Sequence, residues 1–567
     1  RMRTPLFLLL LFGLGLNKLI AQGDGPENTT QGTGPVSGNF QVLWQSYSED
    51  ERIGAIVPPE KTGYNAYGNL RYNQGGFSAG FRYESYLNAV LGFPGRFKGS
   101  GIGYRFARYA SPSQNVDVTI GNFYEQFGSG IVLRSYEERA LGIDNAMDGV
   151  RIILRPIEGI QIKTIYGKQR FDFDDGLING DGIVRGIDGD LDLNALFSKK
   201  SGQDWKTKVN LGANFVSKFQ AGGTIASDTL ILTLPENVGA WSYRLDIMRK
   251  GWSAGAEYAA KINDPSADNG YTYRRGEALM AHLGYTKRGL GISVHAKTVD
   301  NMSFRSDRDV LLFDSPINYI PAITQQHTYN LAATLYPYAT VISGESSLSA
   351  EVFYNIKKGT LLGGKYGTNV SVNFAAANGL DTTNLSGVQG VIDGYERQSW
   401  GFGPEKFVRD FNVQISRKVS KTFKWKYTFY NLEFNTLTTP VTTTFKGMVY
   451  ADIHVLETQW KTAKRESLRT EFQLLLTDQD KRDWGTLLAE YTWSPHWFAS
   501  VLDQYNFSNP NEADRVHYIY AAVGRIEGPH RLSIGYGKRR EGIFCIGGVC
   551  RAVPASNGFE VNFSSSF

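Results

Sequence analysis

The chain has 567 residues, with 60 Lys and Arg against 55 Asp and Glu, and it is rich in Gly (63), Tyr (31), Phe (33) and Trp (10). This composition favours strands and tight turns over helices. The charges alternate in sign along the chain and form no clustered basic segment, so we exclude nucleic acid as a partner.

The first residues predict a secretory signal peptide. Arg1 and Arg3 precede an apolar run over residues 6–16, and cleavage is expected near Ala21 or Gln22, so residues 1–21 form the predicted signal. The run is shorter than the roughly 20 residues that a transmembrane helix needs, which argues against a membrane anchor. No cysteine lies at the cleavage site, so we do not expect a lipoprotein.

A short linker separates this signal from the first strand-like segment. Residues 22–37 are rich in Gly, Thr and Pro, and we predict that they form a flexible tether. Strand-like alternation begins near Phe40, so residues 38–567 form the predicted barrel domain. The tether leaves no room for the folded plug that a TonB-dependent transporter carries ahead of its barrel.

The remaining chain alternates apolar and polar residues with a period of two, which is the pattern of a half-buried strand. Between residues 77 and 84, for example, Phe77 and Phe81 share one face, while Arg82 and Glu84 share the other. About 22–26 such segments predict an all-β fold, namely a large transmembrane antiparallel β-barrel. Its lumen-facing charges should include Arg82, Glu84, Glu257, Lys261, His295, Lys297, Arg469 and Glu471.

The connectors between these segments alternate in length. Short links at residues 157–159, 249–251, 287–289, 419–421, 494–496 and 527–529 take turns with long polar links at residues 89–99, 124–147, 262–276, 301–327 and 377–405. Short periplasmic turns and long extracellular loops are typical of outer-membrane barrels. Aromatic residues near the segment ends predict girdles at the membrane interfaces. Examples are Tyr83, Tyr86, Phe123, Tyr124, Tyr336, Tyr338, Tyr491, Trp493, Trp497, Tyr505, Tyr518 and Tyr520.

The chain ends in an alternating segment, residues 559–567, whose apolar face carries Phe559, Val561, Phe563 and Phe567. It resembles the last strand of bacterial outer-membrane barrels, which the barrel-assembly machinery reads as a signal. We therefore expect insertion by that machinery into outer-membrane lipid, and pairing of this strand with the first strand near Phe40.

One long loop is a candidate pore constriction. Its charges would face each other across the lumen if the loop folded inward, as in selective pores; solvated charges on an external loop are the alternative. The residues are Arg134, Glu137, Glu138, Arg139, Asp144 and Asp148.

Two further features have more than one interpretation. Cys545 and Cys550 are predicted to form a local disulfide that stiffens the last long connector, with metal binding as the alternative. A segment rich in Asp and Gly offers hard oxygen ligands for calcium, the one cofactor considered, although turn chemistry explains it equally well. Its residues are Asp172, Asp174, Asp181, Asp188 and Asp190.

No motif predicts catalysis, and we expect no enzyme. The sequence lacks a G-x-S-x-G elbow, an H-E-x-x-H motif and a phosphate loop, so no catalytic residue is assigned. Dispersed histidines of an outer-membrane hydrolase stay an alternative: His295, His454, His496 and His517.

Several segments resemble an uncharacterised family of outer-membrane proteins from Bacteroidota, a domain of unknown function. They are residues 121–130, 136–139, 263–271, 301–308, 545–551 and 553–558. The resemblance implies an outer-membrane location and supplies no activity. Our first hypothesis is a porin-like solute channel or transporter; the alternatives are a structural or adaptor component of a surface secretion or gliding assembly, and an outer-membrane hydrolase. The solute or protein partner is unknown.

Overall fold

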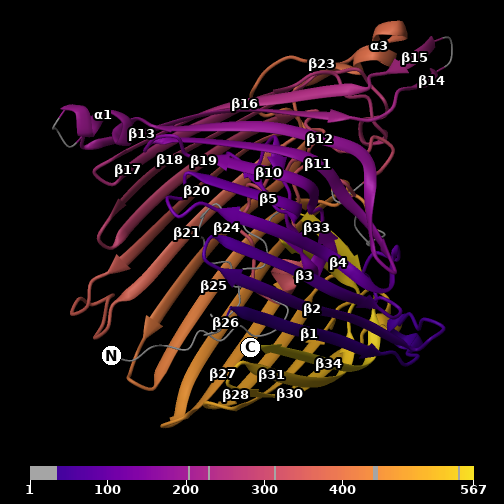
Figure 1. Ribbon diagram of the computed structural model, residues 1–567. Coiled ribbons are helices and arrows are strands. Elements are labelled where there is room, and N and C mark those ends of the chain that lie inside the picture. The colour runs from indigo at the N-terminus through magenta and orange to yellow at the C-terminus, as the bar shows by residue number, and fades with distance from the viewer. Residues whose placement is uncertain (1–34, 202–204, 228–229, 312–313, 439–444, 547–548) are drawn as a thin grey trace.

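The computed structural model describes residues 35–567 apart from residues 202–204, 228–229, 312–313, 439–444 and 547–548, so the predicted signal peptide and nearly all of the tether lie outside the described residues. Its long strands form one closed antiparallel sheet of 24 strands, which confirms the predicted all-β barrel (Figure 1). The strands are β1 (Val36–Ser46), β2 (Thr62–Gln74), β3 (Phe77–Tyr86), β4 (Phe97–Ala110), β5 (Val116–Phe123), β10 (Met147–Leu154), β11 (Ile160–Asp174), β12 (Leu177–Asp192), β13 (Thr207–Phe219), β16 (Asn237–Arg249), β17 (Trp252–Lys261), β18 (Gly276–Lys287), β19 (Leu290–Asp300), β20 (Gly344–Ile356), β21 (Thr368–Asn378), β24 (Lys406–Lys418), β25 (Phe423–Asn435), β26 (Met448–Ala463), β27 (Glu466–Leu476), β28 (Trp484–Trp493), β29 (Trp497–Tyr505), β30 (His517–Glu527), β31 (His530–Arg539) and β34 (Ser556–Ser566).

The last strand closes the barrel against the first. β34 pairs with β1 in a register that sets Phe563 opposite Val42. Gly38 and Phe567 exchange two backbone hydrogen bonds, of 3.1 and 3.0 Å. Of the predicted assembly-signal residues, Phe559 and Phe567 are exposed on the outer surface, at 51% and 65%. The closure lies near Phe40, where the sequence predicts it.

The sheet has a polar inner face and an apolar outer face, which is the reverse of a water-soluble protein. Arg82 on β3 is 1% exposed and points into the lumen, whereas its neighbours Phe81 and Tyr83 are exposed on the outer face. The same reversal recurs around the barrel, because polar residues gather inside and large apolar residues outside. Exposed outer residues include Ile120, Tyr166, Ile187, Phe215, Tyr243, Leu283, Phe472, Leu487, Val501, Ile519 and Ile534.

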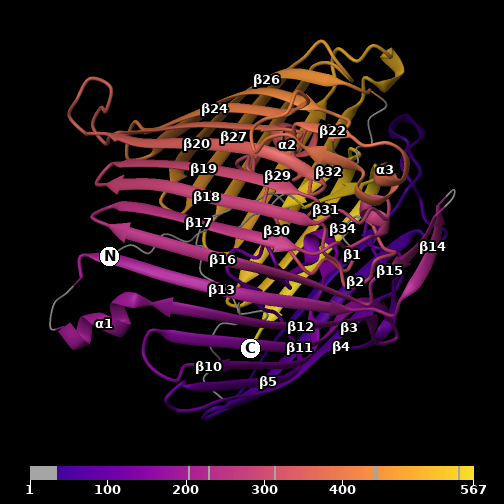
Figure 2. The same ribbon diagram turned by 90° about the horizontal axis from the view of Figure 1, so that it is seen from above.

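The connectors divide into two ends, as Figure 2 shows with α1 (Leu193–Ser201) at one end and α3 (Gly387–Asp393) at the other. All the short links predicted from the sequence lie at the α1 end, which we call the turn end. Residues 193–206 and 357–367 are the two longer connectors there. The opposite end, called the loop end, carries three small hairpins: β14 (Gly223–Ser227) with β15 (Leu230–Leu234), β22 (Thr382–Asn384) with β23 (Tyr395–Arg397), and β32 (Gly542–Ile546) with β33 (Val549–Val553).

The wall is uneven beside β5 and β10. These neighbours have 8 residues each, whereas β4 has 14 and β11 has 15. Beyond their loop-side ends, β4 and β11 pair directly, Phe97 with Phe173 and Lys98 with Asp174. The chain between β5 and β10 therefore leaves the wall on the turn-end side of the pairing between β4 and β11.

Within the described residues, no helix is long and apolar enough to cross a membrane. The predicted aromatic girdle is present in part, since Trp493 and Trp497 are 44% and 47% exposed on the outer face. Other members were placed wrongly, because they are buried inside the barrel: Tyr86, Phe123, Tyr124, Tyr336 and Tyr338.

The closure predicts a specific sensitivity at Gly38. A Cβ at Gly38 would lie 2.6 Å from both the Asn69 carbonyl oxygen and the Phe567 ring, whereas a Cβ at Gly68 would lie 3.7 Å from Phe40. We expect Gly38→Ala to lower the free energy of unfolding by about 1–3 kcal/mol through overpacking. Gly68→Ala is the matched control and should change it little. Urea titrations followed by heat-modifiable gel mobility measure both, and equal midpoints would contradict this account of the closure.

Candidate functional site: the inner loops of the lumen

Residues 124–146, the first inner loop, cross the interior of the barrel. The Ser129 amide donates to Glu257 Oε2 on β17 at 2.9 Å, and Lys163 Nζ on β11 donates to the Gln126 carbonyl at 3.1 Å. Phe127 is fully buried against the inner face of β12, where a side chain at Gly186 would meet its ring at 2.8 Å. Glycine at this position therefore makes room for the loop.

Residues 301–311 and 314–343, the described part of the second inner loop, first pack against the first inner loop. The Arg134 amide donates to the Ile317 carbonyl at 2.8 Å, and the Tyr319 amide donates to the Gly130 carbonyl at 3.0 Å. Apolar side chains from both loops and from β12 to β19 form one buried cluster. It includes Phe127, Ile131, Val132, Leu133, Val184, Val216, Val238, Met302, Phe304 and Ile317.

The second inner loop then crosses to the opposite wall and forms α2 (Asn330–Thr334). The Leu331 amide donates to Gln473 Oε1 on β27 at 3.0 Å, and His327 Nε2 lies 2.7 Å from Asp410 Oδ2 on β24. A second apolar cluster surrounds α2. It includes Tyr329, Leu331, Ala332, Tyr336, Tyr338, Val408, Leu432, Phe434, Ile453, Val455 and Leu475.

A network of six charges, buried on the wall and half-buried on the loop, ties the first inner loop to the wall. We call it the latch: Arg82 and Glu84 on β3, Arg170 on β11, and Glu137, Arg139 and Asp144 on the loop. Arg82 lies 2.7 Å from Glu84, 2.8 Å from Glu137 and 2.5 Å from Asp144, while Arg170 lies 2.7 Å from Glu84 and 2.8 Å from Asp144. Three positive charges thus balance three negative ones.

The surroundings shift the pKa values of two neighbouring carboxylates on the first inner loop, those of the latch residue Glu137 and of Glu138. Burial would raise the pKa of Glu137, but the guanidinium groups of Arg139 and Arg82 outweigh it and hold this pKa below its ordinary value. Burial raises the pKa of the neighbouring Glu138, whose side chain accepts a weak hydrogen bond from the Ala140 amide at 3.4 Å. Glu137 is therefore held as the anion, whereas Glu138 is shifted towards the neutral acid.

The predicted constriction residues do not face each other across an open lumen. Arg139 pairs with Glu137 at 2.7 Å and reaches Gln41 on β1 at 2.6 Å, and Arg134 stacks over the Tyr319 ring at 4.1 Å. Asp148 lies outside the lumen, on the outer face of β10 that it shares with the exposed Leu154, 3.6 Å from Arg105. Its assignment to the constriction is corrected, because the period of two places it opposite the buried Arg151.

The residues predicted to face the lumen all lie on the inner face, and most are paired. Glu257 accepts from Ser242 Oγ at 2.6 Å, and Lys261 lies 3.3 Å from Asp264. Lys297 Nζ lies 2.8 Å from Glu345 and donates to the Pro321 carbonyl at 2.6 Å. Arg469 contacts Glu471, Glu457 and Glu490, and His295 stands beside His282 with ring centroids 6.1 Å apart.

The structure separates the five aspartates considered for calcium. The segment is a long hairpin, in which Asp188 pairs with Lys163 while Asp174 lies at the tip, roughly 36 Å away at about 3.3 Å per residue. Asp188 lies 2.8 Å from Arg244, and Asp174 lies 3.0 Å from Lys98. Among the described residues, no three His, Cys, Asp or Glu side chains gather as a metal site.

The backbone register of β32 and β33 sets Cys545 opposite Cys550. The cysteine side chains lie outside the described residues, so the disulfide stays a prediction.

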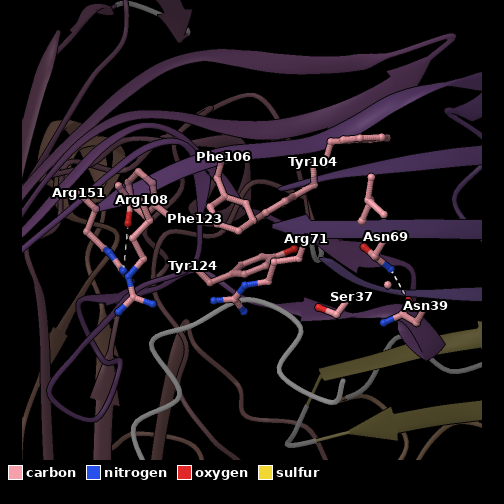
Figure 3. A pocket seen from close by; sticks show the side chains of 14 residues that line it. Ser37, Asn39, Asn69, Arg71, Tyr104, Phe106, Arg108, Phe123, Tyr124 and Arg151 are labelled. Atoms are coloured by element: carbon pink, nitrogen blue, oxygen red, sulfur yellow. Dashed lines mark hydrogen bonds between the residues drawn. The ribbon is translucent and has the colours of Figure 1, made fainter. Parts of the chain in front are cut away.

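A small cavity borders the latch between β1–β5 and β10 (Figure 3). Its volume is about 70 Å³, which holds a few water molecules. Tyr124 connects the cavity to the latch, because its hydroxyl donates to Asp144 at 2.8 Å. Arg71, Arg108 and Arg151 are among its other lining residues.

Sequence reasoning missed the residues that hold α2. From Val449 to Val455 the inner face of β26 is wholly apolar, while the outer face carries Asp452 and His454, which reverses the usual assignment of faces in this stretch. That reversal is the signal that an apolar segment fills the lumen here. The inner residues are Val449, Ala451, Ile453 and Val455, each 0–2% exposed.

The latch predicts a large effect at Arg170. Arg170→Met leaves Glu84 and Asp144 short of a buried partner, so we expect the free energy of unfolding to fall by about 3 kcal/mol or more. Trypsin should then cut the folded barrel after Arg134 or Arg139. The control Arg185→Met removes an exposed guanidinium that bonds Ser217 and Asn237. Unchanged protease resistance in Arg170→Met would show that the latch does not hold the loop.

Comparisons with known proteins place the chain in a family without naming an activity. Among solved structures, it is similar to the siderophore receptor PirA of Pseudomonas aeruginosa (11% identity, 95% of this chain and 81% of that chain, TM-score 0.40). It is also similar to the P pilus usher PapC translocation pore (9%, 94% and 99%, 0.41) and to OpdQ of Pseudomonas aeruginosa (10%, 83% and 96%, 0.31). A search of curated proteins finds no match. The model of one family, described as "Family of unknown function (DUF6029)", matches residues 3–567, and the chain therefore belongs to this family.

Proposed function

We propose that the protein is an outer-membrane solute channel or transporter that rests closed and opens when its inner loops move. The exposed apolar outer face supports insertion in a bilayer, because in hydrocarbon a closed barrel leaves no backbone group unpaired. The predicted signal peptide and terminal strand support the outer membrane as the location. The resemblance to Bacteroidota proteins stays a prediction about the source.

The observation that carries the proposal is the latch. It joins the first inner loop to the wall by ion pairs, at the place where β5 and β10 are short. Such pairs can exchange for water when the loop moves, because the charges on both sides can be hydrated. A separate cavity of about 620 Å³ lies at the turn end and is lined by Arg155, Asp190 and Arg244 among others.

A second candidate is a structural or adaptor component of a surface secretion or gliding assembly. The observation that favours it is the apolar packing of α2, where Leu331 and Ala332 are fully buried against the wall. A plug packed in this way is costly to displace, since a buried Leu side chain contributes about 1.5–3 kcal/mol. In this case the barrel would never open.

We include no catalysis in the proposal, in line with the expectation from the sequence. The histidines considered for a hydrolase stand apart. His454 bonds the Tyr427 hydroxyl at 2.8 Å, His517 lies 2.8 Å from Asp503, and His496 lies 3.4 Å from Glu527. These are three separate places on different strand pairs.

The channel proposal predicts the effect of neutralising the latch. Wild-type barrels in planar bilayers should open rarely. Glu137→Gln with Asp144→Asn removes two latch carboxylates, and we expect the open probability to rise by about tenfold or more. Asp148→Asn is the matched control, because Asp148 lies on the outer face. Frequent opening of the wild type would contradict the closed resting state, and silence of every variant, with no solute uptake, would favour the adaptor.

The latch also predicts a pH dependence with a definite sign. The pKa of Glu137 is lowered while the loop is in place, so ionised Glu137 stabilises the closed loop. This stabilisation is complete above the ordinary glutamate pKa of about 4.3 and is lost as the pH falls through the lower pKa of the closed loop. Conductance should therefore stay constant from about pH 8 to 5 and rise below about pH 4. The experiment uses a Glu138→Gln background, because the raised pKa of Glu138 adds a second titration. If the variant with both Glu137→Gln and Glu138→Gln showed an equal rise in conductance at low pH, the titrating group would be a residue other than Glu137.

A further inference from the structure

The turn end of the barrel carries a strong excess of positive charge. Outside residues 198–204, its connectors contain ten basic residues and one acidic residue, Glu158. Nine of the ten basic side chains are exposed, and Arg155 is half-buried. We call them the basic rim: Arg155, Lys206, Lys250, Arg288, Lys357, Lys358, Lys365, Lys421, Lys464 and Arg465.

The loop end has the opposite balance. Residues 379–405, one of its longest connectors, carry four acidic residues and one basic residue, and residues 47–61 carry four acidic and two basic. Along the chain the two kinds of connector take turns, so the charges alternate in sign. The barrel topology brings every second connector to the same end, so the basic connectors gather at the turn end and the acidic ones at the loop end.

An aromatic belt lies on the outer face just inside the basic rim. Trp252 and Tyr285 are cross-strand neighbours with ring centroids 4.6 Å apart, and Phe423 and Trp460 are neighbours at 4.1 Å. Trp493 on β28 and Trp497 on β29 are also cross-strand neighbours. Such rings mark the boundary between hydrocarbon and head groups.

The order of these groups along the strands matches a lipid leaflet. Lys250 lies two residues beyond Trp252, Arg288 three beyond Tyr285, and Lys464 four beyond Trp460. At about 3.3 Å per residue, the cations stand roughly 7–13 Å from the rings along the strand, at the depth of phospholipid phosphates. A site for an acidic protein would not need a ring of aromatic residues on the lipid side.

We propose that the basic rim binds the head groups of anionic phospholipids in the leaflet that meets the turn end. In an outer membrane with short turns facing the periplasm, this is the inner leaflet. The proposal rests on the membrane insertion proposed above and does not depend on gating. The interaction is electrostatic, so it should weaken as salt screens the charges.

The full-length barrel is reconstituted in phosphatidylcholine bilayers that contain brominated phosphatidylglycerol or brominated phosphatidylcholine, and quenching of its tryptophans gives the relative binding constant of the two lipids. Trp252, Trp460, Trp493 and Trp497 report on the turn end. We expect a preference for phosphatidylglycerol of about threefold or more, which falls towards one at about 1 M salt. Lys358→Gln, Lys421→Gln, Lys464→Gln and Arg465→Gln together remove four of the ten rim charges and should lower this preference clearly below that of the wild type.

The matched control removes four exposed basic residues from the loop end: Arg52→Gln, Lys61→Gln, Lys446→Gln and Arg482→Gln. This variant should keep the preference. Equal binding of both lipids by the wild type, or equal loss in the two variants, would overturn the inference and leave the rim to an acidic protein. Failure of a folded barrel to enter bilayers at all would instead count against the proposed function.

Discussion

Hydrocarbon offers no hydrogen-bond partner to a peptide group, and this constraint requires every strand of the barrel to be paired on both edges. The chain meets it by pairing β34 with β1, so that Phe567 returns to Gly38 and no edge remains. Closure of 24 strands encloses a wide interior. Many inward side chains of that interior are polar or charged, and each of these needs water or a protein partner.

The inner loops supply those partners. Lys297 donates to the Pro321 carbonyl, Glu257 accepts from the Ser129 amide, and Gln473 accepts from the Leu331 amide. Wall and loops therefore satisfy each other, and the apolar clusters on either side exclude water between them. The first inner loop enters the lumen where β5 and β10 end early. Beyond their loop-side ends β4 pairs with β11, and this pairing directs residues 124–146 inward. The latch lies at that point, where a change in its ion pairs would act directly on the movement of the first inner loop.

Much of the fold could be predicted from the sequence, because a strand with one lipid face and one lumen face imposes a period of two on every segment. The alternation of short and long connectors followed from the same topology. The period could also have placed Asp148 outside, since it shares the face of Val150 and Leu154. The inward course of the loops could not be predicted in this way. It depends on contacts between residues far apart in the chain, such as Phe127 with Gly186 and His327 with Asp410. Likewise, the basic rim exists only once the barrel brings alternate connectors to one end.

The central claim is that residues 124–146, 301–311 and 314–343 fill the lumen, and hydrogen–deuterium exchange of the barrel in bilayers tests it most directly. Amides bonded inside the lumen, such as those of Ser129, Tyr319 and Leu331, exchange only when the loops open. The account predicts that peptides from both inner loops exchange slowly, while the exposed α3 at the loop end exchanges fast. Exchange of the inner loops as fast as that of α3 would show that the lumen is not filled by them and would contradict the account.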